Sequence, residues 1–153
     1  MLALVVFLAL SFAAAAVGGL AAAGGTGDWY ASIAKPSWTP PDWVFGPVWT
    51  VLYATIGIAA WLVWRRRAEF LVTPALASWG VQLVLNAMWT GLFFGLHLPG
   101  LAFAEILVLV IAVAVTLVLF ASVSWPAGAL LVTYLVLICF AATLNGAIWH
   151  LNR

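Results

Sequence analysis

The sequence predicts an all-α integral membrane protein, folded as a single bundle of five transmembrane helices over residues 1–153. Hydrophobic residues make up 67% of the chain and charged residues only 6%, against roughly 25% charged residues in an ordinary soluble domain. The mean hydropathy is +1.22. The apolar residues form five runs, each close to the roughly 20 residues that a helix needs to cross a membrane. Most charges lie where these runs pause; they are Lys35, Arg65, Arg66, Arg67, Arg153, Asp28, Asp42, Glu69 and Glu105.

The first run covers residues 2–24 and has two possible interpretations. Small residues follow its apolar core at positions 13–16, as in a cleaved signal peptide. No Lys or Arg precedes the run, however, and it is long for a signal core. We therefore interpret it as the first transmembrane helix.

The other four runs are expected to form helices two to five. They cover residues 44–64, 74–96, 101–122 and 126–149. A proline stands near the start of each, at positions 47, 74, 99 and 126, where its missing backbone donor costs little. The prolines therefore support these boundaries.

Basic residues set the expected orientation. Arg65, Arg66 and Arg67 follow the second run, whereas Lys35 and Arg153 lie on the opposite side of the membrane. Because cytoplasmic loops carry the excess of Lys and Arg, we expect a multi-pass protein of a bacterial membrane with its amino terminus in the cytoplasm.

The segment 25–43, between the first two runs, is expected to form a rigid lid over a binding site. Prolines 36, 40 and 41 fix the backbone in non-helical geometry. Aromatic residues, Trp38 among them, stand between and beside these prolines. A preorganised aromatic surface of this kind suits a flat apolar ligand.

Polar and aromatic residues recur at helical spacing inside the spans. Unpaired polar groups in hydrocarbon cost several kcal/mol, so the helix faces that carry them should look into the bundle. Such a face is formed in the third run by Gln82, Asn86, Trp89 and Phe93, in the second by Phe45, Trp49 and Tyr53, and in the fifth by Tyr134, Ile138, Ala141 and Asn145.

Ala87, Gly91 and Gly95 form a row of small residues on roughly the opposite face of the third run. Such a row lets another helix approach closely. Packing against a neighbour within one subunit and a homodimer interface both explain it, and the sequence leaves the two open.

Other titratable residues point to no catalytic or metal centre. The lone Cys139 excludes an intramolecular disulfide, and we expect neither a metal site nor a nucleic-acid partner. His97 and His150 are read as interfacial residues rather than axial haem ligands. Glu105 is either an interfacial carboxylate near a helix start or a proton-coupling group.

Taken together, these motifs resemble the TspO/MBR family, which contains the bacterial tryptophan-rich sensory proteins and the mitochondrial translocator protein, or peripheral benzodiazepine receptor. The resemblance covers essentially the whole chain. It rests on Trp29-Tyr30, Lys35-Pro36-Ser37-Trp38-Thr39-Pro40-Pro41, Trp43, Gly46-Pro47-Val48-Trp49, Leu52-Tyr53, Gln82 to Asn86, Trp89, Phe93-Phe94-Gly95, Phe140-Ala141 and Leu144-Asn145.

The resemblance implies a five-helix bundle, usually a homodimer, that binds porphyrins such as protoporphyrin IX and haem as ligands and requires no cofactor. It also implies synthetic ligands of the isoquinoline carboxamide and benzodiazepine classes. The pocket implied by motif match is lined by Tyr30, Trp38, Trp49, Tyr53, Asn86, Trp89, Ala141 and Asn145.

Two departures from the family pattern limit what can be transferred. Thr133 and Leu137 stand where members commonly have a proline and a tryptophan. Porphyrin breakdown in some members is associated with paired tryptophans, so Leu137 argues against that activity here. The proposed cholesterol motif of the family, which needs a tyrosine followed closely by Lys or Arg, is absent.

Three functions are therefore compared. The leading hypothesis is a binding and regulatory protein whose ligand stacks on Trp38, Trp49 and Trp89, with Asn86 and Asn145 bonded to its polar edge. A transporter of the same ligands is the alternative, although five spans without an internal repeat argue against it. An enzyme acting on a bound porphyrin is the third, and no catalytic residue is predicted for it.

Overall fold

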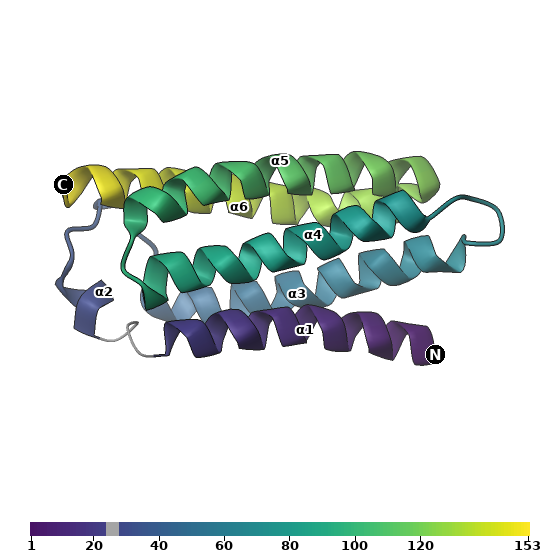
Figure 1. The fold of residues 1–153 in the computed structure, drawn as a ribbon, viewed down its shortest axis with the longest axis horizontal. Coiled ribbons are helices and arrows are strands. Elements are labelled where there is room, and N and C mark those ends of the chain that lie inside the picture. The colour runs from purple at the N-terminus through teal and green to yellow at the C-terminus, as the bar shows by residue number, and fades with distance from the viewer. Residues whose placement is uncertain (24–27) are drawn as a thin grey trace.

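The computed structural model describes residues 1–23 and 28–153, and most of them are helical (Figure 1). The ends of the predicted first helix and the start of the predicted lid loop, within residues 24–27, lie outside the described residues. The elements are α1 (Leu2–Ala22), α2 (Asp28–Ser32), α3 (Asp42–Arg65), α4 (Thr73–Thr90), the π-helix η1 (Gly91–Gly95), α5 (Pro99–Val123) and α6 (Trp125–Leu151).

The described residues contain six α-helices, one more than the five transmembrane helices that the sequence predicts. The additional helix is α2, a five-residue turn inside the segment predicted as a lid loop. The carbonyl oxygen of Trp29 closes this turn, because it accepts hydrogen bonds from the Ile33 amide at 3.2 Å and the Ser32 hydroxyl at 2.8 Å. The prolines that exclude a helix begin only at Pro36.

Four helices, α1, α3, α5 and α6, are long and apolar enough to cross a membrane among the residues described. The third predicted span, residues 74–96, is not one of them. It consists of α4 and η1 in direct succession, and α4 is less apolar because it carries Gln82 and Asn86. The sequence therefore located this helix but not its change from α- to π-geometry.

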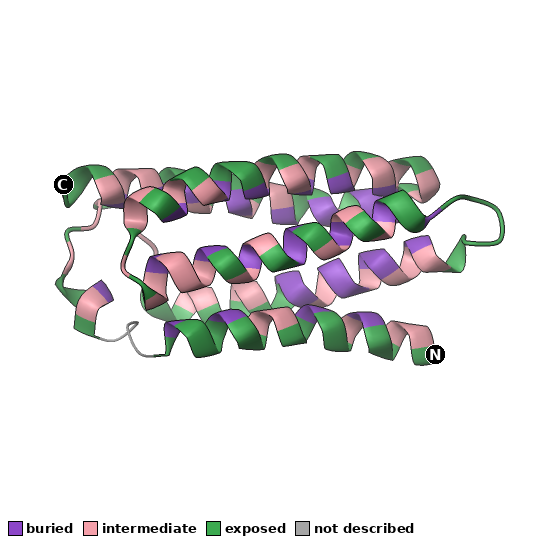
Figure 2. Cartoon of the chain, viewed as in Figure 1, coloured by how far each residue is buried: buried purple, intermediate pink, exposed green. Residues whose placement is uncertain are grey.

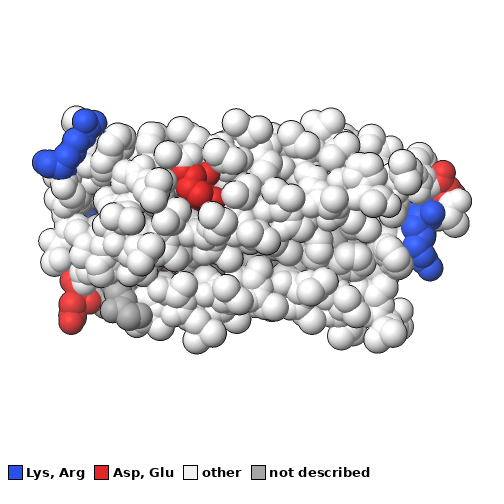
Figure 3. All heavy atoms as spheres, in the orientation of Figure 1, with Lys and Arg blue, Asp and Glu red and all other residues white. Residues whose placement is uncertain are grey.

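The outer surface of the bundle is apolar between two charged ends. Figure 3 shows the charged residues of this face at its two ends, apart from one acidic group between them, and exposed positions cover the outside of the helices (Figure 2). Leu20, Ile111 and Val118 are 77%, 65% and 65% exposed. A water-soluble monomer rarely exposes so much contiguous apolar surface, so this is the surface of a protein embedded in lipid.

Small residues allow close helix packing inside the bundle. Gly18 of α1 faces the side chain of Thr90, while Gly91 and Gly95 face Ala21 of α1. Gly57 of α3 packs against the opposite part of α1, at Leu8. Two members of the predicted row of small residues are thus used within one subunit, and the row gives no independent argument for a dimer.

Polar side chains inside the bundle pair with one another across helices. Tyr53 of α3 donates its hydroxyl hydrogen to the Asn86 side-chain oxygen. The Asn86 amide donates to the Tyr134 hydroxyl at 3.0 Å, which in turn donates to Gln82 at 3.0 Å. Gln82 and Asn86 are 1% and 0% exposed. This confirms the prediction that their helix face looks into the bundle.

Candidate functional site

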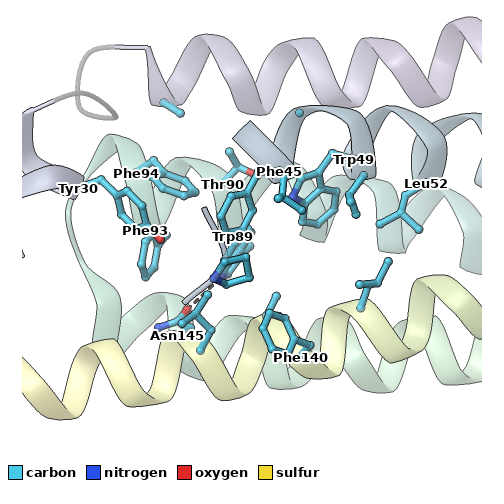
Figure 4. Close-up of a pocket in the computed structure, with 18 of the residues that line it drawn as sticks. Tyr30, Phe45, Trp49, Leu52, Trp89, Thr90, Phe93, Phe94, Phe140 and Asn145 are labelled. Atoms are coloured by element: carbon cyan, nitrogen blue, oxygen red, sulfur yellow. Dashed lines mark hydrogen bonds between the residues drawn. The ribbon is translucent and has the colours of Figure 1, made fainter. Parts of the chain in front are cut away.

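A cavity of about 500 Å³ opens at the α2 end of the bundle, and we call it the aromatic cavity (Figure 4). Its walls come from α1, α2, α3, α4, η1 and α6, and Pro40 reaches it from the segment before α3. It is lined by Gly19, Ala22, Tyr30, Pro40, Val44, Phe45, Gly46, Val48, Trp49, Leu52, Tyr53, Trp89, Thr90, Phe93, Phe94, Leu137, Phe140, Ala141, Leu144, Asn145 and Ile148.

Three near-parallel aromatic rings form one wall of this cavity. The ring centroids of Trp49 and Trp89 are 6.3 Å apart with 27° between the planes. Trp89 is stacked in the same way on Phe93, at 5.7 Å and 27°. The rings therefore follow one another along the wall in near-parallel orientation, and a flat ligand inserted beside them can stack on an aromatic surface.

The π-helix η1 brings two consecutive aromatic side chains to the cavity. Phe93 and Phe94 both line it, and both belong to η1. Trp89 contacts the face of Phe93 and, at 81° between planes, the edge of Phe94. Short π-segments are frequent at functional sites.

Several polar side chains on the cavity wall already have partners within the protein. Asn145 accepts a hydrogen bond from the Trp89 indole N–H at 2.9 Å and donates to the Pro99 carbonyl oxygen at 2.8 Å; the first bond is the dashed line in Figure 4. Thr90 donates to the Asn86 carbonyl oxygen at 3.0 Å, and Tyr53 donates to the Asn86 side chain. The wall consequently offers a ligand mainly apolar and aromatic surface.

The segment above the cavity is fastened by two sets of side-chain contacts near its middle. Lys35 donates to the Tyr30 carbonyl oxygen and lies 4.6 Å from the centroid of the Tyr30 ring. Near the carboxyl terminus, Asn152 pairs with the backbone of Ala34 through two hydrogen bonds of 3.0 and 2.8 Å. Burial, with a further contribution from the Asp42 carboxylate, raises the pKa of Tyr30. The lid is thus held to α6 in this closed position.

Six of the eight predicted site residues line the aromatic cavity: Tyr30, Trp49, Tyr53, Trp89, Ala141 and Asn145. Trp38 and Asn86 do not. Trp38 is 48% exposed and packs edge-to-face on Phe140 at 5.7 Å, so it stands outside the wall rather than on it. Asn86 is fully buried behind Tyr53, and its side-chain oxygen accepts a hydrogen bond from the Tyr53 hydroxyl.

Sequence reasoning missed several lining residues as site residues. Phe45 was already on the predicted inner face of its helix, four residues before Trp49, and could have been included. Phe94 lies in η1, next to the predicted inner-face residue Phe93, and was not selected as a site residue. Gly19 and Ala22 line the cavity through the packing of α1, which periodicity cannot show in a run of small residues.

The titratable residues singled out from the sequence lie off the cavity wall. His97 stacks on Trp29 with ring centroids 4.3 Å apart and has a φ of 56°. Both carboxylate oxygens of Glu105 are buried without a hydrogen-bond partner among the described residues. Within residues 1–23 and 28–153, no group of three potential metal ligands is found.

The amino-acid sequence of this chain is similar to those of known membrane proteins. A sequence model of the TspO/MBR family matches residues 6–150. The chain is 38% identical over 150 residues to Protein CrtK of Rhodobacter capsulatus, covering 97% of this chain and 94% of that protein. It is 42% identical over 128 residues to the human Translocator protein, covering 82% of this chain and 75% of that protein. It is also 40% identical over 128 residues to the Tryptophan-rich protein TspO of Chlorobaculum tepidum, covering 81% of this chain and 79% of that protein.

Proposed function

The chain belongs to the TspO/MBR family, and we propose that it is a membrane-embedded binding and regulatory protein for porphyrins, such as protoporphyrin IX and haem, and for similar flat apolar ligands. The observation that carries this proposal is the aromatic cavity. Its volume of about 500 Å³ lies within the range of about 300–1,000 Å³ typical of small-molecule sites.

The wall of stacked rings supports a planar ligand. Trp49 and Trp89 both line the cavity with near-parallel rings, and an aromatic pair contributes about 0.5–1.5 kcal/mol beyond the burial of its area. Leu137 adds an aliphatic contact where the family often has a third indole. Stacking in this chain therefore falls mainly to Trp49 and Trp89.

The amide side chains near the cavity are already hydrogen-bonded within the protein, and this affects where the polar edge of a ligand can lie. Asn145 uses its amide for Trp89 and Pro99, and Asn86 is behind the wall. Both amide side chains are thus held in place by partners within the protein, and Asn86 does not reach the cavity wall. We propose instead that the polar edge of the ligand lies at the mouth of the cavity, beside the Tyr30 and Lys35 lid.

We further propose that the membrane is crossed five times, with α4 and η1 together forming the crossing that hydropathy alone does not reveal. Gly91 and Gly95 hold this segment against α1, which is itself a candidate span. The excess of arginines after α3 favours an amino terminus in the cytoplasm.

Titration of protoporphyrin IX into the detergent-solubilised protein tests the proposal, with Trp49→Ala as the variant and Trp43→Ala as its control. Trp43 is 76% exposed at the start of α3 and does not line the cavity. Loss of one stacking partner should weaken binding by about 2- to 12-fold for Trp49→Ala and leave Trp43→Ala at the wild-type affinity. Equal affinities of the two variants would contradict the assignment of the site.

A further inference from the structure

A second hollow lies at the opposite end of the bundle, where α3 leaves the membrane and α5 turns into α6, and we call it the arginine groove. Its volume is about 640 Å³. This is the end that also carries the amino terminus of the chain (Figure 1). The groove is lined by Leu62, Arg65, Arg66, Glu69, Phe70, Val123, Ser124, Trp125 and Pro126.

Of the three consecutive arginines, Arg65 is the one whose guanidinium has no hydrogen-bond or ion-pair partner among the described residues. Arg66 forms an ion pair with Glu69 at 2.8 Å. Arg67 donates to the Trp64 carbonyl oxygen at 3.1 Å, stacks on the Trp64 ring at 4.7 Å and does not line the groove. Arg65 stacks on the Trp61 ring at 5.0 Å and has no hydrogen bond or ion pair in the described part of the chain. Stacking thus holds its guanidinium in place while its N–H donors stay free.

Ser124 adds a second free polar group to the same groove. Its backbone oxygen accepts hydrogen bonds from the Ala127 and Gly128 amides, but its hydroxyl makes none within the described residues. Glu69 is already neutralised by Arg66. The groove therefore carries one uncompensated positive charge beside a hydroxyl donor.

The remaining walls are apolar and lie at the edge of the membrane. Trp125 is 75% exposed and Phe70 44% exposed, and aromatic side chains of this kind concentrate where hydrocarbon meets water. Leu62, in the last turn of α3, and Val123, the last residue of α5, add aliphatic surface to the groove. A ligand that fits both features has an anionic head and a hydrocarbon tail.

We propose that the arginine groove binds an anionic phospholipid, with the phosphate on Arg65 and Ser124 and an acyl chain along Leu62 and Val123. Guanidinium groups match the phosphate oxygens in charge and geometry, and basic pockets between transmembrane helices bind anionic lipid head groups on the cytoplasmic side. A free phosphate ion would leave the apolar half of the groove unused. The inference is independent of the porphyrin site, which lies at the other end of the bundle.

Native mass spectrometry of the protein released from mixed micelles tests this proposal, with phosphatidylglycerol and phosphatidylcholine supplied in equal amounts. The wild-type protein should retain one phosphatidylglycerol in preference to phosphatidylcholine. Arg65→Gln should reduce that preference at least fivefold, and Ser124→Ala should reduce it less. Arg153→Gln is the matched control. Arg153 also stacks on a tryptophan, Trp149 at 4.7 Å, but it lies at the opposite end of the bundle. This variant should retain the wild-type preference for phosphatidylglycerol.

Two results would overturn the proposal. Equal losses in Arg65→Gln and Arg153→Gln would show that net charge, not the groove, attracts the lipid. Displacement of phosphatidylglycerol by an equal concentration of inorganic phosphate would show that the groove recognises the phosphate alone. If Arg65→Gln folds poorly, Ser124→Ala still tests the proposal, because it removes only one half-buried hydroxyl oxygen. This variant must lower the preference for phosphatidylglycerol over phosphatidylcholine.

Discussion

The hydrogen bond from the Trp89 indole to Asn145 should be a measurable part of the stability of this protein. The bond is 2.9 Å long and joins α4 to α6, and Asn145 also donates to Pro99 at the start of α5. Asn145→Leu removes both bonds while nearly preserving side-chain size. Hydrogen bonds between membrane helices contribute about 0.6 kcal/mol on average and about 1.7 kcal/mol at most. The substitution should therefore lower the free energy of unfolding by about 1–3 kcal/mol.

A double-mutant cycle isolates the bond itself. Trp89→Phe removes the indole donor, and its coupling to Asn145→Leu should be about 0.6–1.7 kcal/mol when unfolding is followed by circular dichroism during titration with sodium dodecyl sulfate. Thr143→Val is the control on the same helix, because the Thr143 hydroxyl bonds only to Phe140 of its own helix; its effect should stay within about 0.5 kcal/mol. A coupling energy of zero would refute the assignment of Asn145 as the partner of Trp89.

Three further predictions address other contacts. Gly95→Ala drives a methyl group into the Ala21 carbonyl oxygen and should destabilise the protein. In Gly80→Ala the new methyl group meets no atom within 4 Å, so this control should stabilise the protein by up to about 1 kcal/mol. The same denaturant titration compares the two variants, and equal effects would contradict the packing of α1. Asn152→Ala removes both bonds to Ala34 and should speed porphyrin binding and release in stopped-flow experiments, with unchanged rates arguing against a fastened lid. Leu137→Trp adds an indole to the cavity wall and should tighten protoporphyrin IX binding by about 2- to 12-fold; weaker binding would show that the cavity has no room for it.

The sequence predicted the helices well because hydrophobic runs and prolines mark them directly. Pro99 and Pro126 lie at the starts of α5 and α6, as expected. It did not predict α2, because one turn of helix needs only a few local hydrogen bonds and leaves no periodic pattern. Nor did it predict η1, since a π-segment differs from an α-helix in its register and not in its composition.

The candidate site was predicted in part for the same reason. Trp49, Trp89 and Asn145 follow from helical spacing, which fixes the direction of each side chain within its own helix. Asn86 has the correct direction but lies one layer behind the wall, because Tyr53 stands between it and the cavity. Trp38 belongs to a loop, where prolines fix the backbone without fixing which side of Phe140 the indole occupies. Depth and loop placement depend on tertiary packing that spacing alone does not contain.

A structure of the protein with protoporphyrin IX bound is the most direct test of the central claim. The macrocycle should lie in the aromatic cavity, parallel to the rings of Trp49 and Trp89, with its carboxylate edge at the mouth beside Tyr30. The hydrogen bond between Trp89 and Asn145 should remain in place. A porphyrin bound on the lipid-facing surface, or one whose polar edge replaces Trp89 as the partner of Asn145, would contradict the account.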